Sequence, residues 1–291
     1  MITFADISME KDLIEIWHKS FGDSIEYIHM FLQWNASGAK IIVYMIEDRP
    51  VSVAYLLPLV YRKAGEQDIP CWYLYAAATL PEYRGRGYFG DILNFIKEHV
   101  PEPVILVPAE QSLTRYYERQ GLHVWQKEEV LSVEAGKKVQ ETINPECMLQ
   151  RSCAQSHNAT ESLAHIDVQV YEAAREAYLH RMGYMKWYTH FLKYIFQENI
   201  ICGGRQKSFE IEGRHYAVIY RIEEQCLKVL ELIRMDGAYT MVQADEISNC
   251  AAALMKMTGC TSAQVCIRPP VMALGKLPSQ PGEGYFNLTM G

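Results

Sequence analysis

The apolar positions of the N-terminal part of the chain predict two helices followed by a hairpin. Over residues 8–22 and 24–38, apolar side chains recur three or four positions apart, which is typical of helices with one buried face. Residues 40–46 and 51–61 are rich in β-branched and aromatic residues and therefore favour strands. The turn-forming residues 47–50 between them predict a hairpin.

The pattern then alternates between strands and helices. Residues 71–80 form a nearly uncharged run, closed by a proline, that predicts a buried strand. Apolar residues at helical spacing over 89–100 predict a helix. Further along, the pattern indicates a short strand at 104–107, a helix at 112–119 and a strand at 123–133. This order predicts a layered α+β fold with helices flanking a sheet.

The rest of the chain reads as a polar linker followed by a second unit. Residues 136–165 are polar and rich in structure-breaking residues, so we expect a first domain at 1–135, a linker, and a second domain at 166–291. The hairpin at 47–55 has a counterpart at 212–220, and neighbouring helices and strands repeat at a similar separation. A constant order of elements favours duplication, although chance similarity also explains so few identities.

A turn that carries two arginines and two glycines joins the strand at 71–80 to the helix that follows. Its residues are Arg84, Gly85, Arg86 and Gly87. Glycines let the backbone approach a ligand, and the first turn of the helix adds unpaired N–H groups and the positive end of its dipole. A pyrophosphate suits this combination, and a solvated turn is the alternative. The second unit has no such arginine turn, so we expect it to lack a phosphate site.

Two segments resemble signatures of the GNAT acyltransferase superfamily. The segment 80–87 (LPEYRGRG) resembles its acetyl-CoA motif, in which Arg84 and Gly87 match, whereas Phe89 stands at the final, normally small position. The segment 112–122 (SLTRYYERQGL) resembles a second conserved block of the superfamily. The resemblance covers the first half of the chain, and tandem GNAT proteins of the enhanced-intracellular-survival type are similar in having a related second unit.

The resemblance implies a GNAT fold with a mixed, mostly antiparallel sheet, and acetyl-CoA as co-substrate. It implies that the strand end and the turn bind this co-substrate, through Ala78, Thr79, Leu80, Arg84, Gly85, Arg86, Gly87, Tyr88, Phe89 and Gly90. No metal is expected, because the histidines and cysteines lack ligand spacing.

The catalytic residues are less evident from the sequence. The resemblance implies that Tyr117 protonates the departing thiolate, and a core tyrosine is the alternative. Glu110, which follows the predicted strand at 104–107, is a candidate general base, and a solvated glutamate is the alternative. The terminal carboxylate of Gly291 is a further candidate base, by similarity to the tandem proteins. Cysteines offer a covalent route that we consider less favoured than direct attack: Cys202, Cys260 and Cys266.

Composition and charge limit the classes of partner that the protein is expected to bind. The chain of 291 residues is 49% hydrophobic and 22% charged, with a net charge of −7. This charge argues against nucleic acid and favours cationic small molecules or peptides. We expect a cytoplasmic protein that has no membrane partner, because no signal peptide, long apolar run or paired cysteines are visible. We also expect that the protein can form an oligomer.

These features predict an acetyl-CoA-dependent N-acetyltransferase that acts on a primary amine of a small molecule or peptide. We expect the second unit to form a wall of the acceptor pocket, and Tyr73 and Tyr75 either to line this pocket or to pack in the core. The alternative is a non-catalytic acyl-CoA-binding or regulatory module. A third possibility, transfer from a charged tRNA, is disfavoured by the acidic charge.

Overall fold

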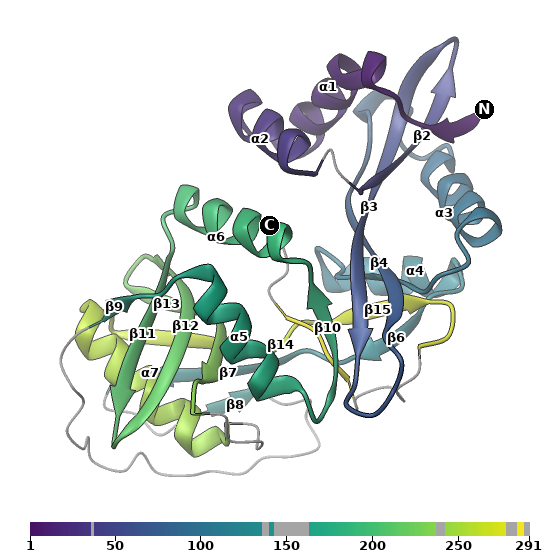
Figure 1. Ribbon diagram of the computed structural model, residues 1–291. Helices are drawn as coiled ribbons and strands as arrows, with labels where there is room; N and C mark the ends of the chain where they lie inside the picture. The colour runs from purple at the N-terminus through teal and green to yellow at the C-terminus, as the bar shows by residue number, and fades with distance from the viewer. Residues whose placement is uncertain (36–37, 136–139, 143–162, 237–241, 278–283, 288–291) are drawn as a thin grey trace.

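The computed structural model describes residues 1–35, 38–135, 140–142, 163–236, 242–277 and 284–287. The described residues form two β-sheets, each flanked by helices (Figure 1). The predicted layered α+β architecture is confirmed. Within the described ranges, no helix combines the length and the apolar composition needed to cross a bilayer.

Along its main path the first sheet is antiparallel except between β4 and β5. Its strands are, in spatial order, β1 (Ile2–Phe4), β2 (Lys40–Ile46), β3 (Arg49–Arg62), β4 (Ile69–Thr79), β5 (Val104–Leu106), β15 (Val271–Leu274) and β6 (His123–Gln126). Two further strands extend it from the end of β3, namely β10 (Gly183–Trp187) and β16 (Gly284–Tyr285).

The second sheet repeats this order. Its strands are β9 (Ala164–His165), β11 (Arg205–Ile211), β12 (Arg214–Glu223), β13 (Cys226–Arg234), β14 (Ser262–Arg268), β7 (Glu129–Glu134) and β8 (Gln140–Thr142). Every neighbouring pair has the same sense as its counterpart in the first sheet, including the single parallel pair, β13 with β14. This agreement supports the predicted duplication.

Each sheet contains strands from the other part of the chain. Strand β15, from the C-terminal part of the chain, lies between β5 and β6, and β7, from the N-terminal part, pairs with β14 (Figure 1). The predicted single strand at 123–133 is therefore wrong, because β6 and β7 lie in different sheets. The domain bounds 1–135, 136–165 and 166–291 stay a prediction, and most of that linker lies outside the described residues.

Helices cover both faces of each sheet. In chain order they are α1 (Glu10–Phe21), α2 (Ile25–Asn35), α3 (Tyr88–His99), α4 (Thr114–Arg119), α5 (Val168–Leu179), α6 (Thr189–Ile201) and α7 (Ala244–Thr258), with short 3-10 turns at Ile7–Met9, Pro81–Tyr83 and Gln111–Leu113. Buried residues of α1 and α2 pack on one face of the first sheet, and those of α3 and α4 on the other. Helix α6 packs against α2 and joins the two units through apolar contacts.

Candidate active site

Strands β4 and β5 diverge in the middle of the first sheet. They pair only at Trp72 with Val104 and at Tyr73 with Ile105, although β4 continues to Thr79. Beyond the divergence, β4 carries a β-bulge, with Ala76 in the left-handed region at φ 45°. Bulges redirect side chains and end pairing, and they are common beside functional sites. The bulge therefore marks the place where the edge of β4 turns away from its neighbour.

The turn that follows β4 is open and rich in unpaired amides. Gly85 and Gly87 have φ values of 77° and 83°, a region that strongly favours glycine, and a Cβ atom at either would meet nothing within 4 Å. Helix α3 begins at Tyr88, and its N-cap, Gly87, receives no side-chain cap. In the part of the chain that the structure describes, the N–H groups of residues 85–90 donate to no backbone carbonyl. The turn thus presents the amides and dipole that bind an anion.

Both arginines are anchored at this turn. Arg84 donates from Nε to the carbonyl of Thr79 at 3.0 Å, which ties it to the end of β4. Arg86 donates to the carbonyl of Glu82 at 3.1 Å and lies over the ring of Tyr83, 5.3 Å from its centre. A guanidinium has five N–H donors, so one bond to the backbone leaves donors for a ligand.

Tyr88, Phe89 and Gly90 open α3. They contribute only backbone groups to this surface, because the Tyr88 and Phe89 side chains pack against other residues and Gly90 lies close to a neighbouring side chain. Tyr88 stacks on Tyr44, with ring centres 4.4 Å apart. Phe89 packs against Tyr116 and Tyr117. A Cβ on Gly90 would lie 3.5 Å from the Gln120 side chain. The bulky Phe89 at a normally small position is therefore accommodated by the aromatic residues of α4.

The end of β4 offers one amide toward the divergence. The N–H of Leu80 is already bonded to the carbonyl of Val51 at 2.9 Å, and the carbonyl of Ala78 accepts from the Ser52 hydroxyl at 3.0 Å. Successive residues of a strand direct their N–H groups to opposite edges. The N–H of Thr79 therefore points away from β3, toward the side where β4 and β5 separate.

Tyr117 lies on the buried face of α4, within the cluster that packs below β4. Its side chain is 9% exposed, and its ring meets those of Tyr116 and Phe89 edge to face. Burial, with a smaller contribution from Tyr116, raises the pKa of Tyr117 to about 12. Its phenol also contributes, after burial and Glu198, to the raised pKa of Tyr73 on β4. The structure thus brings Tyr117 near the divergence, in a position that also serves the core.

Glu110 lies on a different side of α4. It precedes the 3-10 turn, accepts a hydrogen bond from Ser112 at 3.0 Å, and lines an open groove of about 1360 Å³. Thr114, Arg115 and Glu118 line the same groove, and Tyr117 does not. The structure therefore does not bring Glu110 and Tyr117 together. The other candidate base, the carboxylate of Gly291, lies outside the described residues.

The sequence did not reveal a buried polar cluster on the opposite face of β4. Glu198 of α6 is 1% exposed and accepts a hydrogen bond from the hydroxyl of Tyr27 at 3.1 Å. Tyr194 donates to the same hydroxyl at 3.3 Å, and the hydroxyl of Tyr75 on β4 is near enough to influence the pKa of Tyr27. The available signal was the spacing of Glu198 along the apolar face of its helix, three or four residues after Tyr194 and Ile195.

The second sheet has a bulge at the equivalent place, and a buried ion pair lies beside it. Glu231, fully buried beside this bulge, pairs with Nε of Arg175 at 3.0 Å. The hydroxyls of Tyr171 and Tyr285 also donate to it. The residues that correspond in sequence to the arginine turn, 237–241, lie outside the described residues.

Comparisons with known proteins agree with this geometry. A family model for the acetyltransferase (GNAT) domain matches residues 2–125. A conserved Enterococcus faecalis protein of unknown function superposes with a TM-score of 0.66 at 14% identity, over 94% of this chain and 72% of that one. A GCN5-related N-acetyltransferase from Anabaena variabilis gives 0.63 at 12% identity over 94% and 72%. Eis1 from Mycobacterium abscessus gives 0.59 at 10% identity over 92% and 66%. No curated protein matches the chain.

At these identities, the solved structures share the fold of this chain, and the family assignment comes from the family model. The matched segment holds the bulged β4, the glycine turn and helices α3 and α4. Residues 2–125 of this chain therefore match an acetyltransferase (GNAT) domain in sequence and share the fold of the solved GNAT structures.

Proposed function

We propose that the protein transfers the acetyl group of acetyl-CoA to a primary amine of a small molecule or peptide. The observation that carries this proposal is the open turn at 85–90, whose unpaired amides lie at the start of α3 beside the divergence of β4 and β5. The acetyltransferase (GNAT) domain that residues 2–125 match uses acyl-CoA as donor. Acetyl-CoA is the simplest such donor, and its pyrophosphate suits the turn.

The pyrophosphate of the co-substrate binds at the turn in this proposal. The amides of residues 85–90 donate to its oxygens, and Arg84 and Arg86 add charge-assisted hydrogen bonds. The pantetheine arm then follows the free edge of β4. The N–H of Thr79 lies on that edge and supports the thioester end of the co-substrate, whereas Leu80, Tyr88 and Phe89 support the site through packing.

The chemistry is a direct attack by the amine. The nitrogen of the neutral amine bonds to the thioester carbon, the carbon–sulfur bond breaks, and the nitrogen loses a proton to solvent. Tyr117 donates a proton to the departing thiolate and regains one from solvent. Its raised pKa keeps the phenol protonated near neutral pH. Burial raises the pKa of a thiol as well, so donor and acceptor remain comparable in the same apolar surroundings.

A covalent route through cysteine receives less support. Burial raises the pKa of Cys266 to about 12, so little thiolate forms at neutral pH. Partial burial of its thiol also raises the pKa of Cys202. Both shifts disfavour a thiolate nucleophile and leave direct attack as the simpler path.

The two surviving functions differ in turnover. Purified protein is incubated with acetyl-CoA and a panel of primary amines, and released thiol is measured with a chromogenic disulfide. Amine-dependent release that falls in Tyr117→Phe supports the transferase. Acetyl-CoA binding without release over the whole panel supports the non-catalytic acyl-CoA-binding module instead.

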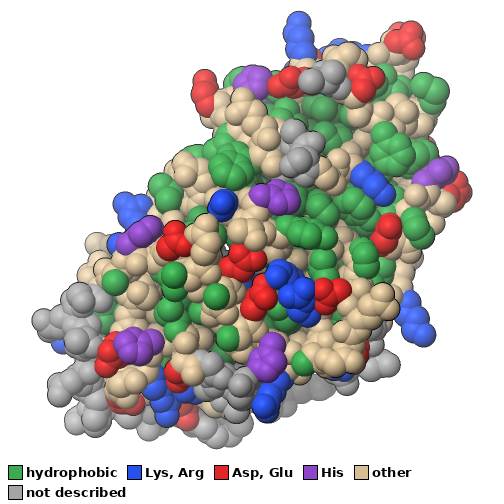
Figure 2. Space-filling view, viewed as in Figure 1, with side chains coloured by type: hydrophobic (Ala, Val, Ile, Leu, Met, Phe, Trp, Pro, Cys, Tyr) green, Lys and Arg blue, Asp and Glu red, His purple; other side chains and the backbone are tan. Residues whose placement is uncertain are grey.

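On the face of the molecule in Figure 2, acidic and basic side chains are interspersed, without a continuous basic band. Together with the net charge of −7, this supports a small cationic acceptor over a nucleic acid.

A further inference from the structure

At the bulge, neighbouring residues of β4 point to opposite faces of the first sheet and join different clusters. Leu74 and Ala77 belong to the cluster under α3 and α4, the side on which the arginine turn lies. Tyr73 and Tyr75 point to the opposite face, where they pack with residues of α1, α2 and α6. If the co-substrate enters from the α3 side, the acceptor amine reaches the thioester from the side of Tyr75.

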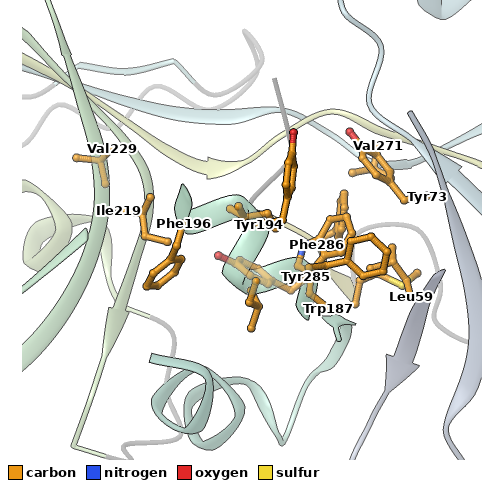
Figure 3. Close-up of a cluster of buried hydrophobic side chains, with 14 of the residues drawn as sticks. Leu59, Tyr73, Trp187, Tyr194, Phe196, Ile219, Val229, Val271, Tyr285 and Phe286 are labelled. Carbon is orange, nitrogen blue, oxygen red and sulfur yellow. The ribbon is translucent and has the colours of Figure 1, made fainter. Parts of the chain in front are cut away.

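Both units build the surroundings of Tyr75. Its ring contacts Trp17 and Phe31 of the first unit, with ring centres 5.8 and 5.4 Å away. Phe31 in turn contacts Tyr194 of α6 at 5.7 Å. Below it, Tyr73 packs against Trp187 and Phe286, so aromatic side chains from both units meet on this face of β4 (Figure 3). An aromatic surface of this kind suits an alkylammonium group.

Hydroxyl groups lie between Tyr75 and a buried carboxylate. The Tyr75 hydroxyl is near enough to that of Tyr27 for each to influence the pKa of the other, and Tyr27 donates to Oε1 of Glu198 at 3.1 Å. Tyr75 and Tyr27 are partly exposed, whereas Glu198 is 1% exposed. A buried carboxylate is costly unless it has partners, so three tyrosines around one glutamate form a built arrangement.

Titratable groups whose pKa values Glu198 influences come from α2, β4, α6 and the C-cap of α6. Among the described residues they include Tyr27 of α2, Tyr73 and Tyr75 of β4, Tyr194 of α6, and Cys202 at its C-cap. Burial is the main cause of the raised pKa of each group, and the negative charge of Glu198 raises it further. The raised pKa values keep these neighbours protonated near neutral pH, whereas a carboxylate is a proton acceptor by its chemistry.

We propose that Glu198 is the final proton acceptor for a primary alkylamine substrate, reached through the hydroxyls of Tyr75 and Tyr27. This inference rests on the proposed transferase function. The ammonium gives a proton to the Tyr75 oxygen, Tyr75 passes its proton to Tyr27, and Tyr27 passes its own to Glu198. The products of this step are a neutral amine, two unchanged phenols and a protonated Glu198.

The remaining protons balance with the transfer. After nitrogen attacks the carbonyl carbon, it loses its second proton to solvent. The departing thiolate gains a proton from Tyr117, and Tyr117 regains one from solvent. Glu198 returns its proton to solvent before the next cycle. Because Glu198 acts through Tyr75 and Tyr27, it is a positioning residue for the proton path, and its effect depends on the protonation state of the amine.

The acceptor class follows from this role. Alkylamines have pKa values near that of lysine, about 10.4, so they arrive as ammonium ions and need a proton acceptor. Arylamines are far less basic and arrive neutral. The relay therefore matters for alkylamines and is dispensable for arylamines.

The test compares both amine classes in wild type, Glu198→Gln and a matched control, Glu223→Gln, which makes the same change at an exposed position of the second unit. Glutamine still accepts the Tyr27 hydrogen bond. We expect Glu198→Gln to lower kcat for an alkylamine by about 100-fold at pH 7, the usual size of acid–base catalysis. The loss should shrink as the pH approaches 10, while arylamine turnover and acetyl-CoA affinity stay within twofold of wild type.

A second variant protects the test against misfolding. Tyr27→Phe removes one hydroxyl of the relay from a partly exposed side chain, and we expect the same pH-dependent loss. The double variant should lose no more than either single variant, because both changes interrupt one path.

The outcomes separate the two proposals. Wild-type turnover together with an unaffected Glu198→Gln, or an equal loss for alkylamines and arylamines, overturns the relay alone. Binding of acetyl-CoA by wild type without turnover of either amine class overturns the proposed function, and the relay with it.

Discussion

The guanidinium of Arg84 donates a hydrogen bond to the backbone carbonyl of Thr79 at 3.0 Å, which connects the glycine turn to the end of the bulged strand. This contact holds the arginine beside the first amides of α3. A charge that is fixed before the ligand arrives costs less entropy on binding than a mobile one.

Removing either arginine should weaken co-substrate binding. We expect Arg84→Ala and Arg86→Ala each to raise the Kd for CoA by about tenfold or more, since a charged hydrogen bond contributes roughly 1.5–3 kcal/mol. Calorimetry measures this change. Arg214→Ala, at an exposed arginine of β12, is the control and should bind normally. Unchanged affinity in both turn variants would contradict the phosphate assignment.

The conformation of Gly87 gives a second prediction. Alanine in the left-handed region costs about 1–2 kcal/mol, and nothing within 4 Å obstructs the added methyl group. We therefore expect Gly87→Ala to lower stability by that amount and also to weaken CoA binding. Gly22→Ala, with φ 78° at the C-cap of α1, should lose similar stability and retain full affinity. Equal affinities for CoA in the two variants would argue against the turn as the ligand site.

Tyr117 should affect turnover more than binding. We expect Tyr117→Phe to lower kcat by about 100-fold, with acetyl-CoA affinity nearly unchanged. A pKa of about 12 leaves the Tyr117 phenol protonated over the neutral range. Deprotonation of Tyr117 should therefore not reduce kcat at any pH below about 11. Steady-state rates against pH measure this, and Tyr116→Phe is the neighbouring control. A wild-type decline near pH 8, absent from Tyr117→Phe, would be incompatible with this assignment.

The buried ion pair of the second unit should matter for stability. Glu231→Gln leaves Arg175 buried without its charged partner, which typically costs about 3–5 kcal/mol. Asp68→Asn breaks an exposed pair with Arg62 and should cost about 1 kcal/mol or less. Urea unfolding distinguishes the two. Similar midpoints for both variants would show that the buried pair contributes little.

Local features of this chain were predictable, because their causes are local. The spacing of Ile92, Leu93 and Ile96 indicates the buried face of α3, and Gly87 precedes its first residue. Each of these signals acts within one or two helical turns.

Non-local features were not predictable. The split of 123–133 into β6 and β7 depends on which sheet each strand joins, and β15 takes its place through pairing with distant segments. Glu198 gave only a weak signal, because a single carboxylate in an apolar helix has the same sequence whether it faces solvent or three tyrosines. Its partners come from α2 and β4, which only the tertiary structure brings near.

Strand β15 makes the first sheet depend on the C-terminal part of the chain. A truncation after the first unit would remove the strand between β5 and β6 and expose two unpaired edges in the sheet that carries the turn. A truncation of the first unit would likewise take β7 from its neighbour β14. The second unit, in which a salt bridge lies beside the equivalent bulge, therefore completes the sheet that carries the turn, and each sheet depends on a strand from the other part of the chain.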